Sequence, residues 1–422
     1  MSISSTYTPV LIIGAGQCGL AMSRHLSGRD IDHVILERGD VANSWRTERW
    51  DSLRLLTPNW QTRLPEWHYR GDDPDGYMTA GDVAGYLGDF ADEIRAPIHT
   101  NTTVRSVRRM GGGFAGWEVR TDTDLWFARA VVIATGACST PDIPEMATGL
   151  PDHIDQLSPI HYRNPDELAP GGVLVVGASA SGTQLAEEIH RAGRDVTLAV
   201  SRHVRLPRMY RGMDIQWWLD GTGILADRFD EVPDIARARR APSLQIVGTP
   251  DRRTIDLGLL QDRGVRLAGR VAAVDGPTVR FDDGLAGRVA HADDKLSRLL
   301  DRFDAFATDH GLDPELSAPD RPAPIDAPAT PDAIDLDEAG IGTVIWATGF
   351  RPHYPWLHER VFDERGEIRH DGGVVDAENG LYVLGLPFLR RRRSTFIDGA
   401  GADAADLADH LSTHLTRVPL VV

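Results

Sequence analysis

Short apolar runs alternate with glycine-rich turns over the first 40 residues of the chain. Residues 10–13 are uniformly apolar, a pattern typical of a strand buried on both faces of a parallel sheet. A glycine-rich turn follows, residues 17–26 have helical periodicity, and a second apolar run at 33–36 ends at Glu37. This order of elements predicts a βαβ unit.

The same order of elements returns near the middle of the chain. An apolar run at 173–176 precedes a second glycine-containing turn, which leads into a predicted helix at 183–192 and a predicted strand at 196–200. Two further predicted strands, at 129–134 and 342–346, are both closed by Ala-Thr-Gly. Such internal repetition indicates two units built on one plan.

The rest of the pattern completes an alternation of strands and helices. The other predicted elements are strands at 103–109, 116–120 and 380–384 and helices at 80–90, 292–310 and 401–415. Irregular segments are predicted at 45–67, which is rich in Trp, Pro and Arg, and at 313–337, which is rich in Pro, Ala and Asp.

We therefore predict an α/β fold of two Rossmann-like dinucleotide-binding domains, with the second inserted into the first. The first domain is expected to comprise residues 1–168 and 339–422. The second is expected to comprise residues 169–338, with a helical and Pro-rich excursion at 292–337. The length of 422 residues agrees with two domains, because single hydrophobic cores rarely grow beyond about 250–300 residues.

Charge and cysteine content narrow the class of protein. The chain has 45 basic and 62 acidic side chains, and its net charge of -17 opposes binding to nucleic acid or to an anionic membrane surface. The two cysteines are far apart, which disfavours both a disulfide framework and a Cys-x-x-Cys redox pair. The first residues lack the pattern of a signal peptide, and no run approaches the ~20 apolar residues of a membrane helix. We expect a cytoplasmic protein.

The first turn has the sequence Gly-Ala-Gly-Gln-Cys-Gly and follows a buried strand. Gly14 permits a tight turn, Gly16 lets a pyrophosphate approach the backbone, and Gly19 allows the helix to pack close to the strand. The N-terminus of that helix offers free N–H groups to the phosphates. Glu37 is suited to accept hydrogen bonds from a ribose diol, so this unit is predicted to bind FAD.

The second turn has the sequence Gly-Ala-Ser-Ala-Ser-Gly, with Ser179 in place of the middle glycine. It is expected to hold a pyrophosphate less closely than the first turn. Ser201 and Arg202 follow the next strand, where the first unit has Glu37. An acid repels a 2′-phosphate, whereas a hydroxyl and a guanidinium bind one, so this unit is predicted to bind NADPH. The alternative for Arg202 is a solvated loop residue.

These motifs resemble the flavin-containing monooxygenases, in particular the soluble bacterial branch related to the plant YUCCA-type monooxygenases. The two glycine motifs and the two Ala-Thr-Gly strand ends carry the resemblance, which extends over nearly the whole chain. Trp45 and Arg46 resemble a Trp-Arg pair that follows the first unit in that family and lies near the flavin. Residues 53–55, Leu-Arg-Leu, resemble the next segment of the family pattern.

Other positions match the family less well. His161 stands where the family signature Phe-x-Gly-x-x-x-His has its histidine, but Asp155 and Leu157 replace the Phe and the Gly. Pro165 stands where Baeyer–Villiger enzymes have a tryptophan, which disfavours oxygenation of ketones. Asn59 matches an asparagine near the flavin, with a displacement of one position.

The resemblance implies a monooxygenase that uses FAD, NADPH and O2. NADPH would reduce the flavin, the reduced flavin would capture O2 as a C4a-hydroperoxide, and one oxygen atom would pass to nitrogen or sulfur of a small organic substrate. Arg46, Asn59 and His161 are the residues it suggests for catalysis. No metal site is predicted, and a homodimer is compatible with the sequence.

The two motifs and the resemblance together suggest a set of cofactor-binding residues. They are Gly14, Gly16, Gln17, Cys18, Gly19, Glu37, Arg38, Trp45, Arg46, Val104, Thr135, Gly136, Gly177, Ser179, Ala180, Ser181, Gly182, Ser201, Arg202, Thr348, Gly349 and Asp398.

Several alternatives stay open at this point. The chain is also compatible with an NADPH-dependent reductase that passes electrons to a carrier or quinone, and with a dinucleotide-binding redox sensor that has little turnover. The tryptophans at 45, 50, 60 and 67 either line a substrate channel or pack in a core. The four successive arginines at 390–393 either bind an anionic group or form a basic loop that is solvated or paired with local carboxylates, and we favour such a loop.

Overall fold

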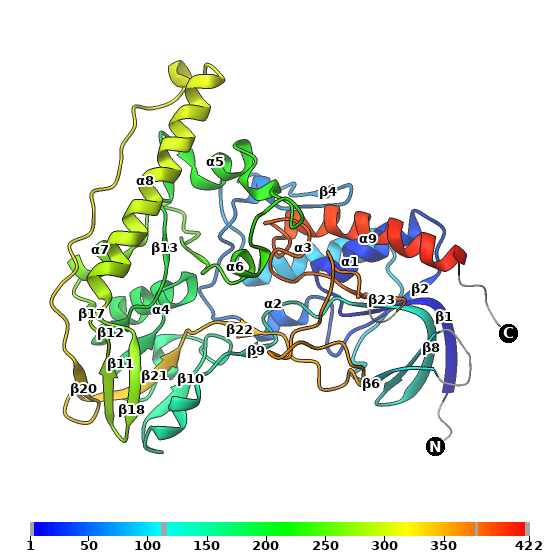
Figure 1. Ribbon diagram of the computed structural model, residues 1–422, viewed down its shortest axis with the longest axis horizontal. Coiled ribbons are helices and arrows are strands. Elements are labelled where there is room, and N and C mark those ends of the chain that lie inside the picture. Colours follow the sequence, from blue (N-terminus) through cyan, green and yellow to red (C-terminus); the bar gives the residue numbers. More distant parts are fainter. Residues whose placement is uncertain (1–3, 111–115, 376–378, 418–422) are drawn as a thin grey trace.

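One mixed and one parallel sheet organise the chain into two α/β units that lie side by side (Figure 1). This computed structural model describes residues 4–110, 116–375 and 379–417. The two-unit α/β fold predicted from the internal repeat is confirmed. None of the helices in these residues is long and apolar enough to cross a membrane.

The first sheet has the strand order β5-β2-β1-β8-β7-β6, and β23 also pairs with β8. Its strands are β1 (Ser4–Ile13), β2 (His33–Leu36), β5 (Ile98–His99), β6 (Val104–Arg109), β7 (Trp117–Thr121), β8 (Asp124–Ile133) and β23 (Leu381–Val383). β7 is antiparallel to both of its neighbours, β6 and β8, and the other pairs are parallel. The apolar runs are buried as predicted, because both faces of the parallel strands are covered.

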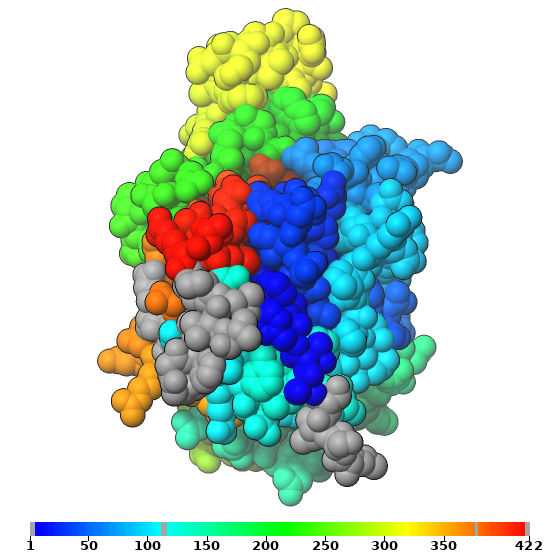
Figure 2. All heavy atoms as spheres, turned by 90° about the vertical axis from the view of Figure 1, so that its right-hand side faces the viewer, coloured from blue at the N-terminus to red at the C-terminus, as the bar shows by residue number. Residues whose placement is uncertain are grey.

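Helices cover the first sheet. α1 (Gln17–Ser27) and α9 (Ile397–Arg417) pack against each other. In Figure 2 the blue surface of α1 adjoins the red surface of α9. α3 (Ala80–Glu93) begins with a capping box in which Thr79 and Asp82 exchange hydrogen bonds. The segment predicted to be irregular contains only α2 (Asn43–Thr47), the 3-10 turn η1 (Asn59–Gln61), and the strand pair β3 (Arg63–Leu64) and β4 (Trp67–His68).

The second sheet is entirely parallel, with the order β10-β21-β11-β12-β17. Its strands are β10 (Asp155–Leu157), β11 (Gly172–Val176), β12 (Val196–Ala199), β17 (Arg266–Ala268) and β21 (Ile341–Trp346). Its helices include α4 (Ala180–Arg191) and α7 (Leu257–Asp262). A small antiparallel sheet joins β18 (Val271–Asp275), β19 (Thr278–Phe281) and β20 (Ala333–Asp335).

The pairing of β10 and β21 corrects the predicted domain boundaries. Both strands belong to the second sheet, so residues 155–168 and 339–346 do not continue the first unit as expected. The strand β21 pairs with β11 on the side away from β12, which is the place that β8 holds beside β1 in the first unit. The chain passes between the units through β9 (Thr140–Pro141) and β22 (Phe350–Arg351), which pair with each other.

The excursion predicted at 292–337 is a helix followed by an extended return. α8 (Leu285–Asp309) begins seven residues earlier than expected and projects from the body of the molecule (Figure 2). Its buried positions follow helical spacing: Leu285, Val289, Ala292, Leu296, Leu300, Phe303 and Ala307. The Pro-rich return runs back along α8, held by ion pairs of Arg321 with Asp301 and Asp304. No intrinsic turn pattern would keep such a segment in place, so these contacts position it.

A lobe between the second sheet and α8 extends over the first unit. It contains α5 (Ile215–Gly221), the 3-10 turn η4 (Ile224–Ala226), α6 (Ile235–Arg239) and the short strands β13 (Val204–Arg205), β14 (Met209–Tyr210), β15 (Met213–Asp214) and β16 (Leu244–Gln245). Arg208 is fully buried there and joins the units: it pairs with Asp214 and donates to the Leu56 carbonyl at 2.7 Å. It also lies over the ring of Tyr77.

Replacing Gly177 by alanine tests the packing on which the second unit depends. The added methyl group would lie 2.3 Å from the Ala347 carbonyl oxygen at a φ of +107°. We expect a loss of about 3 kcal/mol in the free energy of unfolding, because backbone strain and steric overlap add. Thermal unfolding without added nucleotide measures the effect.

Gly193→Ala is the matched control for this experiment. Gly193 has a φ of +87°, but its added methyl group would meet no heavy atom within 4 Å. It is expected to lose about 1 kcal/mol from strain alone. Equal losses in the two variants would show that the contact with Ala347 contributes nothing.

Candidate dinucleotide and substrate sites

The first glycine turn is pressed against the end of β8. Gly14 has a φ of +108°, and a side chain there would come within 2.7 Å of the Ala134 carbonyl oxygen. A side chain at Gly19 would come within 1.9 Å of the Gly14 carbonyl oxygen. A side chain at Gly16 would meet no protein atom within 4 Å. Two of the three glycines therefore serve the packing of the protein, and the middle one leaves free space above the turn.

That free space lies at the N-terminus of α1. Gly16 is the N-cap residue, no side chain caps the helix, and its first turn contains no acid. The first N–H groups of α1 are thus available to an anion. Thr135 and Gly136 close β8 beside this turn, with Gly136 at a φ of +77°.

Glu37 lies at the end of β2 and is 7% exposed. Its two oxygens accept hydrogen bonds from the backbone N–H groups of Ala15, at 2.8 Å, and Gly39, at 3.0 Å. Each carboxylate oxygen accepts more than one hydrogen bond, so a ribose diol can share them. The free N–H groups, the open space at Gly16 and this carboxylate together fit a bound dinucleotide.

The second turn repeats the geometry of the first. Gly177 has a φ of +107° and faces the Ala347 carbonyl oxygen, and a side chain at Gly182 would lie 1.8 Å from the Gly177 carbonyl oxygen. Ser179 adopts φ -87° and ψ -166°, almost the values of Gly16, φ -87° and ψ -174°. The serine therefore changes the space above the turn and leaves its backbone path unaltered.

The surroundings of the second turn differ from those of the first. The N–H of Ala180, in the first turn of α4, donates to Ser243 Oγ at 3.3 Å. Ser201 is half-buried after β12, and Arg202 beside it is exposed and forms no ion pair among the described residues. Thr348 and Gly349 close β21, as Thr135 and Gly136 close β8.

A cavity of about 220 Å³ lies between the two units. Its lining comes from the segment after the first βαβ unit, from the crossing segments and from the start of α4. The lining residues are Trp45, Glu48, Arg49, Trp50, Leu53, Arg54, Leu55, Leu56, Cys138, Pro159, Ile160, Ala180, Ser181, Gln184 and Phe350. Of the four tryptophans considered from the sequence, those at 45 and 50 line this cavity. Its surface is mainly apolar, with two arginines and one acid as the charged groups.

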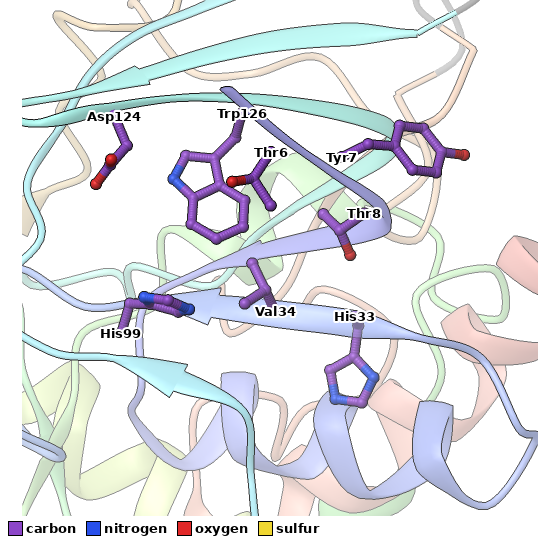
Figure 3. A pocket seen from close by; sticks show the side chains of 8 residues that line it. All are labelled: Thr6, Tyr7, Thr8, His33, Val34, His99, Asp124 and Trp126. Carbon is purple, nitrogen blue, oxygen red and sulfur yellow. The ribbon is translucent and has the colours of Figure 1, made fainter. Parts of the chain in front are cut away.

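A second, larger hollow of about 450 Å³ lies elsewhere on the first unit (Figure 3). It is formed by the first residues of β1 and β8 and by side chains of β2 and β5: Thr6, Tyr7, Thr8, His33, Val34, His99, Asp124 and Trp126. Ligands of open parallel sheets bind beyond the carboxyl ends of the strands, and this hollow lies toward the amino ends of β1 and β8. The smaller cavity is therefore the better candidate for chemistry.

The three residues expected to be catalytic lie outside the lining of the cavity between the units. Arg46 is exposed on α2 and donates to the carbonyl oxygen of Val41 at 3.1 Å. The Asn59 amide is buried, donating to the Asp73 carbonyl and accepting from the N–H of Met78, both at 2.9 Å. His161 is exposed, with Nδ1 3.0 Å from Ser158 Oγ. Asn59 thus holds a loop in place, and the catalytic roles stay predictions.

The remaining predicted cofactor residues are spread around the first unit. Gln17 and Cys18 lie in the first turn of α1, where burial raises the pKa of the Cys18 thiol to about 12. Arg38 forms an exposed ion pair with Glu48, and Val104 is the first residue of β6. The Asp398 side chain is buried at the start of helix α9. It is far in sequence from the first glycine turn, and it lies next to η1 in space.

Sequence reasoning missed two buried polar residues, one of which, Gln61, lies near Asp398. Gln61 and Thr62 are each 1% exposed, and Gln61 Nε2 lies 3.5 Å from Asp398 Oδ2. Both belong to the segment predicted to be irregular, two and three residues after Asn59. The unexpected polarity of these positions inside an aromatic-rich segment was the only signal in the sequence.

Comparison with known proteins agrees with this geometry. Residues 11–220 match the family of pyridine nucleotide-disulphide oxidoreductases. The chain is 32% identical over 408 residues to an uncharacterized CzcO-like oxidoreductase of Geobacillus kaustophilus, covering 96% of this chain and 98% of that protein. It is 26% identical over 427 residues to indole-3-pyruvate monooxygenase YUCCA4 of Oryza sativa subsp. japonica, covering 96% and 87% of the two chains.

A solved structure is similar over the same length. The flavin-containing monooxygenase from Stenotrophomonas maltophilia superimposes with a TM-score of 0.67 at 20% identity, covering 97% of this chain and 99% of that one. The fold is therefore shared over nearly the whole of both chains. The chain belongs to the family of CzcO-like oxidoreductases, and it is similar to flavin monooxygenases in sequence and in fold.

Proposed function

We propose that this protein is an FAD- and NADPH-dependent monooxygenase that transfers one oxygen atom from O2 to a small organic substrate. The observation that carries the proposal is the pair of glycine turns with nearly superimposable backbones but different residues after the following strand, Glu37 in one unit and Ser201-Arg202 in the other. Similarity to flavin monooxygenases in sequence and in fold supports it.

The first unit is the proposed FAD site. Gly16 leaves room for the pyrophosphate, the N-terminus of α1 supplies N–H groups, and Glu37 receives the adenosine ribose. Bound FAD supplies the redox chemistry, accepting reducing equivalents from NADPH and activating O2. The protein contributes binding, orientation and the exclusion of water.

The second unit is the proposed NADPH site. Arg202 is exposed beside Ser201 and forms no ion pair among the described residues, so its guanidinium is available to a 2′-phosphate. The side chain of Ser179 narrows the space above the turn, which suits a nucleotide that binds and leaves in each cycle. Ala180 and Ser181 place the start of α4 at the cavity between the units.

That cavity is the proposed substrate site. Its walls of Trp50, Leu53, Leu55 and Ile160 keep water away from the reacting atoms, which limits wasteful loss of activated oxygen. Such walls suit an apolar molecule that presents a nitrogen or sulfur nucleophile.

A disulfide-reductase function finds less support in the thiols. The chain has only Cys18 and Cys138, and both are free. Cys18 is buried beneath the first turn while Cys138 lines the cavity, so they do not form the adjacent dithiol that such chemistry requires.

Isotope transfer tests the proposal directly. The protein loaded with FAD and reduced by NADPH is mixed with ¹⁸O2 and either a thioether or a tertiary amine as probe. We expect an S- or N-oxide that carries one ¹⁸O atom, with product formed in step with NADPH consumption. Hydrogen peroxide as the sole product of O2, with both probes unchanged, would instead indicate an oxidase or reductase.

Gly16→Ser tests the assignment of the first turn. Ser179 shows that serine fits this backbone, and a side chain at Gly16 meets no protein atom, so thermal unfolding of the apoprotein is expected to stay within about 0.5 kcal/mol of wild type. The hydroxymethyl group would occupy the space of the pyrophosphate, so the dissociation constant for FAD, measured by fluorescence titration, is expected to rise about tenfold or more. Unchanged FAD affinity would place the cofactor elsewhere.

Arg202→Ala tests the assignment of the second turn. Loss of a charge-assisted contact with the 2′-phosphate is expected to raise KM for NADPH by about tenfold to 100-fold, equivalent to about 1.4–3 kcal/mol, and to leave KM for NADH nearly unchanged. Arg191→Ala, which removes an arginine from the far end of α4, is the control. An unaltered NADPH/NADH preference would show that another residue selects the nucleotide.

A further inference from the structure

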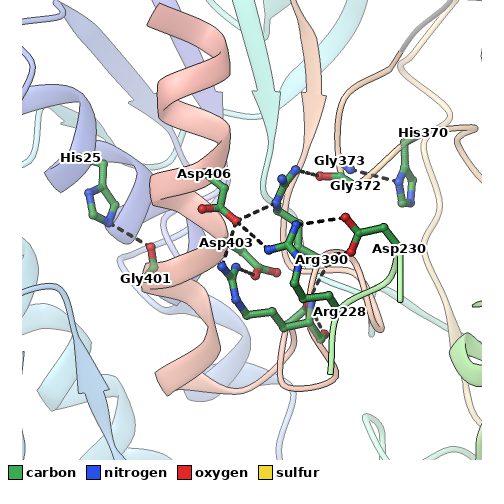
Figure 4. Close-up of polar contacts among 12 residues, drawn as sticks. His25, Arg228, Asp230, His370, Gly372, Gly373, Arg390, Gly401, Asp403 and Asp406 are labelled. Atoms are coloured by element: carbon green, nitrogen blue, oxygen red, sulfur yellow. Dashed lines mark hydrogen bonds and ion pairs between the residues drawn. The ribbon is translucent and has the colours of Figure 1, made fainter. Parts of the chain in front are cut away.

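The four arginines at 390–393 divide between the two units. The first two pair with α9: Arg390 Nε lies 3.0 Å from Asp406 Oδ2, and Arg391 Nη1 lies 2.8 Å from Asp403 Oδ1. Figure 4 shows Asp403 and Asp406 on α9 turned toward Arg390. Of the two forms of the favoured interpretation, a solvated loop or one paired with local carboxylates, the second is confirmed for these side chains.

The last two arginines pair with the lobe of the second unit. Arg392 Nη2 lies 2.8 Å from Asp227 Oδ2, and Arg393 pairs with Asp220 of α5. The backbones also pair: the N–H of Arg392 donates to the Asp227 carbonyl at 3.0 Å, and the N–H of Arg393 donates to the Leu225 carbonyl at 3.2 Å. The segment that precedes α9 is therefore the docking strip for the second unit.

Arg393 differs from its neighbours because one guanidinium serves both units. Nη1 lies 2.7 Å from Asp398 Oδ2, while Nη2 pairs with Asp220. Arg63 lies nearby, 3.5 Å from Asp220 and 3.7 Å from Asp398. Two carboxylates, one from each unit, thus share two arginines, and the cluster has no net charge.

Asp398 is the buried member of this cluster, with its side chain 1% exposed. Burial raises the pKa of its carboxyl, whereas Arg393 and Arg63 lower it. Its second oxygen, Oδ1, has no hydrogen-bond partner in the described structure, and neither have Gln61 Oε1 and Thr62 Oγ1. A buried polar atom without a partner costs about 1–3 kcal/mol, so the unpartnered oxygens of Asp398 and of the adjacent Gln61 mark a place that fits a polar ligand.

The sheet order indicates which part of FAD reaches this place. Glu37 marks the adenosine side of the first turn, next to β2, and β8 with β23 lies on the opposite side of β1. The flavin half must leave the pyrophosphate on that opposite side. The chain after β23 passes Gly385, where a side chain would lie 2.8 Å from Cys18 Sγ, and continues into α9, which packs along α1. The pyrimidine edge of a flavin carries an N–H group, which can donate to an unpartnered oxygen of Asp398 or Gln61.

We propose that Arg393 is a positioning residue that couples the docking of the second unit to the charge beside the flavin, by holding Asp398 with one side of its guanidinium and Asp220 with the other. This inference rests on the proposed FAD site. The negative charge of Asp398 opposes the charge that reduction adds to the flavin, and Arg393 offsets it. The electrostatic effect of Arg393 on the flavin therefore differs between a docked and a withdrawn second unit.

The reduction potential of bound FAD, followed by its absorbance against a reference dye, tests the coupling. In Asp220→Asn, Arg393 and Arg63 have Asp398 as the only carboxylate of the cluster. The cluster therefore gains a net positive charge. We expect the preference for reduced over oxidised flavin to rise about tenfold, an upward shift of about 30 mV for a two-electron couple. Asp220→Glu keeps the charge and is expected to restore the wild-type potential.

Asp227→Asn is the matched control. It breaks the neighbouring ion pair between the same two segments, with Asp227 and Asp220 similarly exposed at 34% and 28%, but Asp227 does not share an arginine with Asp398. Its potential is expected to stay at the wild-type value. No shift in Asp220→Asn, or equal shifts in both variants, would overturn the inference.

A second variant keeps the test decisive if Asp220→Asn does not fold. Arg63 is 49% exposed, and Arg63→Gln removes a positive charge from the cluster, so it is expected to lower the potential. A rise or no change would count against the coupling. A wild-type protein that binds no FAD would instead refute the proposed FAD site, and this inference with it.

Discussion

Both units depend on one close contact that involves no side chain. The first glycine of each turn lies against the carbonyl oxygen at the Ala-Thr-Gly end of the neighbouring strand, Gly14 against Ala134 and Gly177 against Ala347. Both glycines have a positive φ, and any side chain would force the turn away from the sheet. Because the turn is held at the edge of the sheet, each following helix starts there and directs its N–H groups over the carboxyl ends of the strands.

This repeated contact explains why two nucleotide sites exist and why they differ. The backbone paths of the turns are nearly the same, so selectivity rests on the side chains around them: Gly16 or Ser179 above the turn, and Glu37 or Arg202 after the next strand. The space for a substrate arises only where the units meet, because its lining comes from segments of both. The charges that hold the units together extend from that boundary to the buried Asp398.

Local patterns predicted most elements because each rests on neighbours in sequence. The apolar runs, the glycine turns and Glu37 all act within about 25 residues of one another. The strand at 341–346 was also predicted, but its sheet was not, since an apolar run does not reveal which strand lies beside it. The excursion, placed at 292–337, was likewise recognised as helix and loop, while the pairing of Arg321 with α8 was not predicted. Gln61 escaped notice because its contact with Asp398 of α9 joins residues 337 positions apart in the sequence.

The sequence by itself determined the two βαβ units and their glycine turns. It also determined the contrast between the acidic residue that follows the second strand of one unit and the basic residue that follows the second strand of the other. Steric limits and charges over short stretches of chain govern these features. Only the tertiary structure decided that β10 and β21 belong to the second sheet, that a cavity opens between the units, and that Arg393 lies between Asp398 and Asp220. These depend on contacts between segments that are distant in the sequence. The geometry of such contacts follows from how whole units pack.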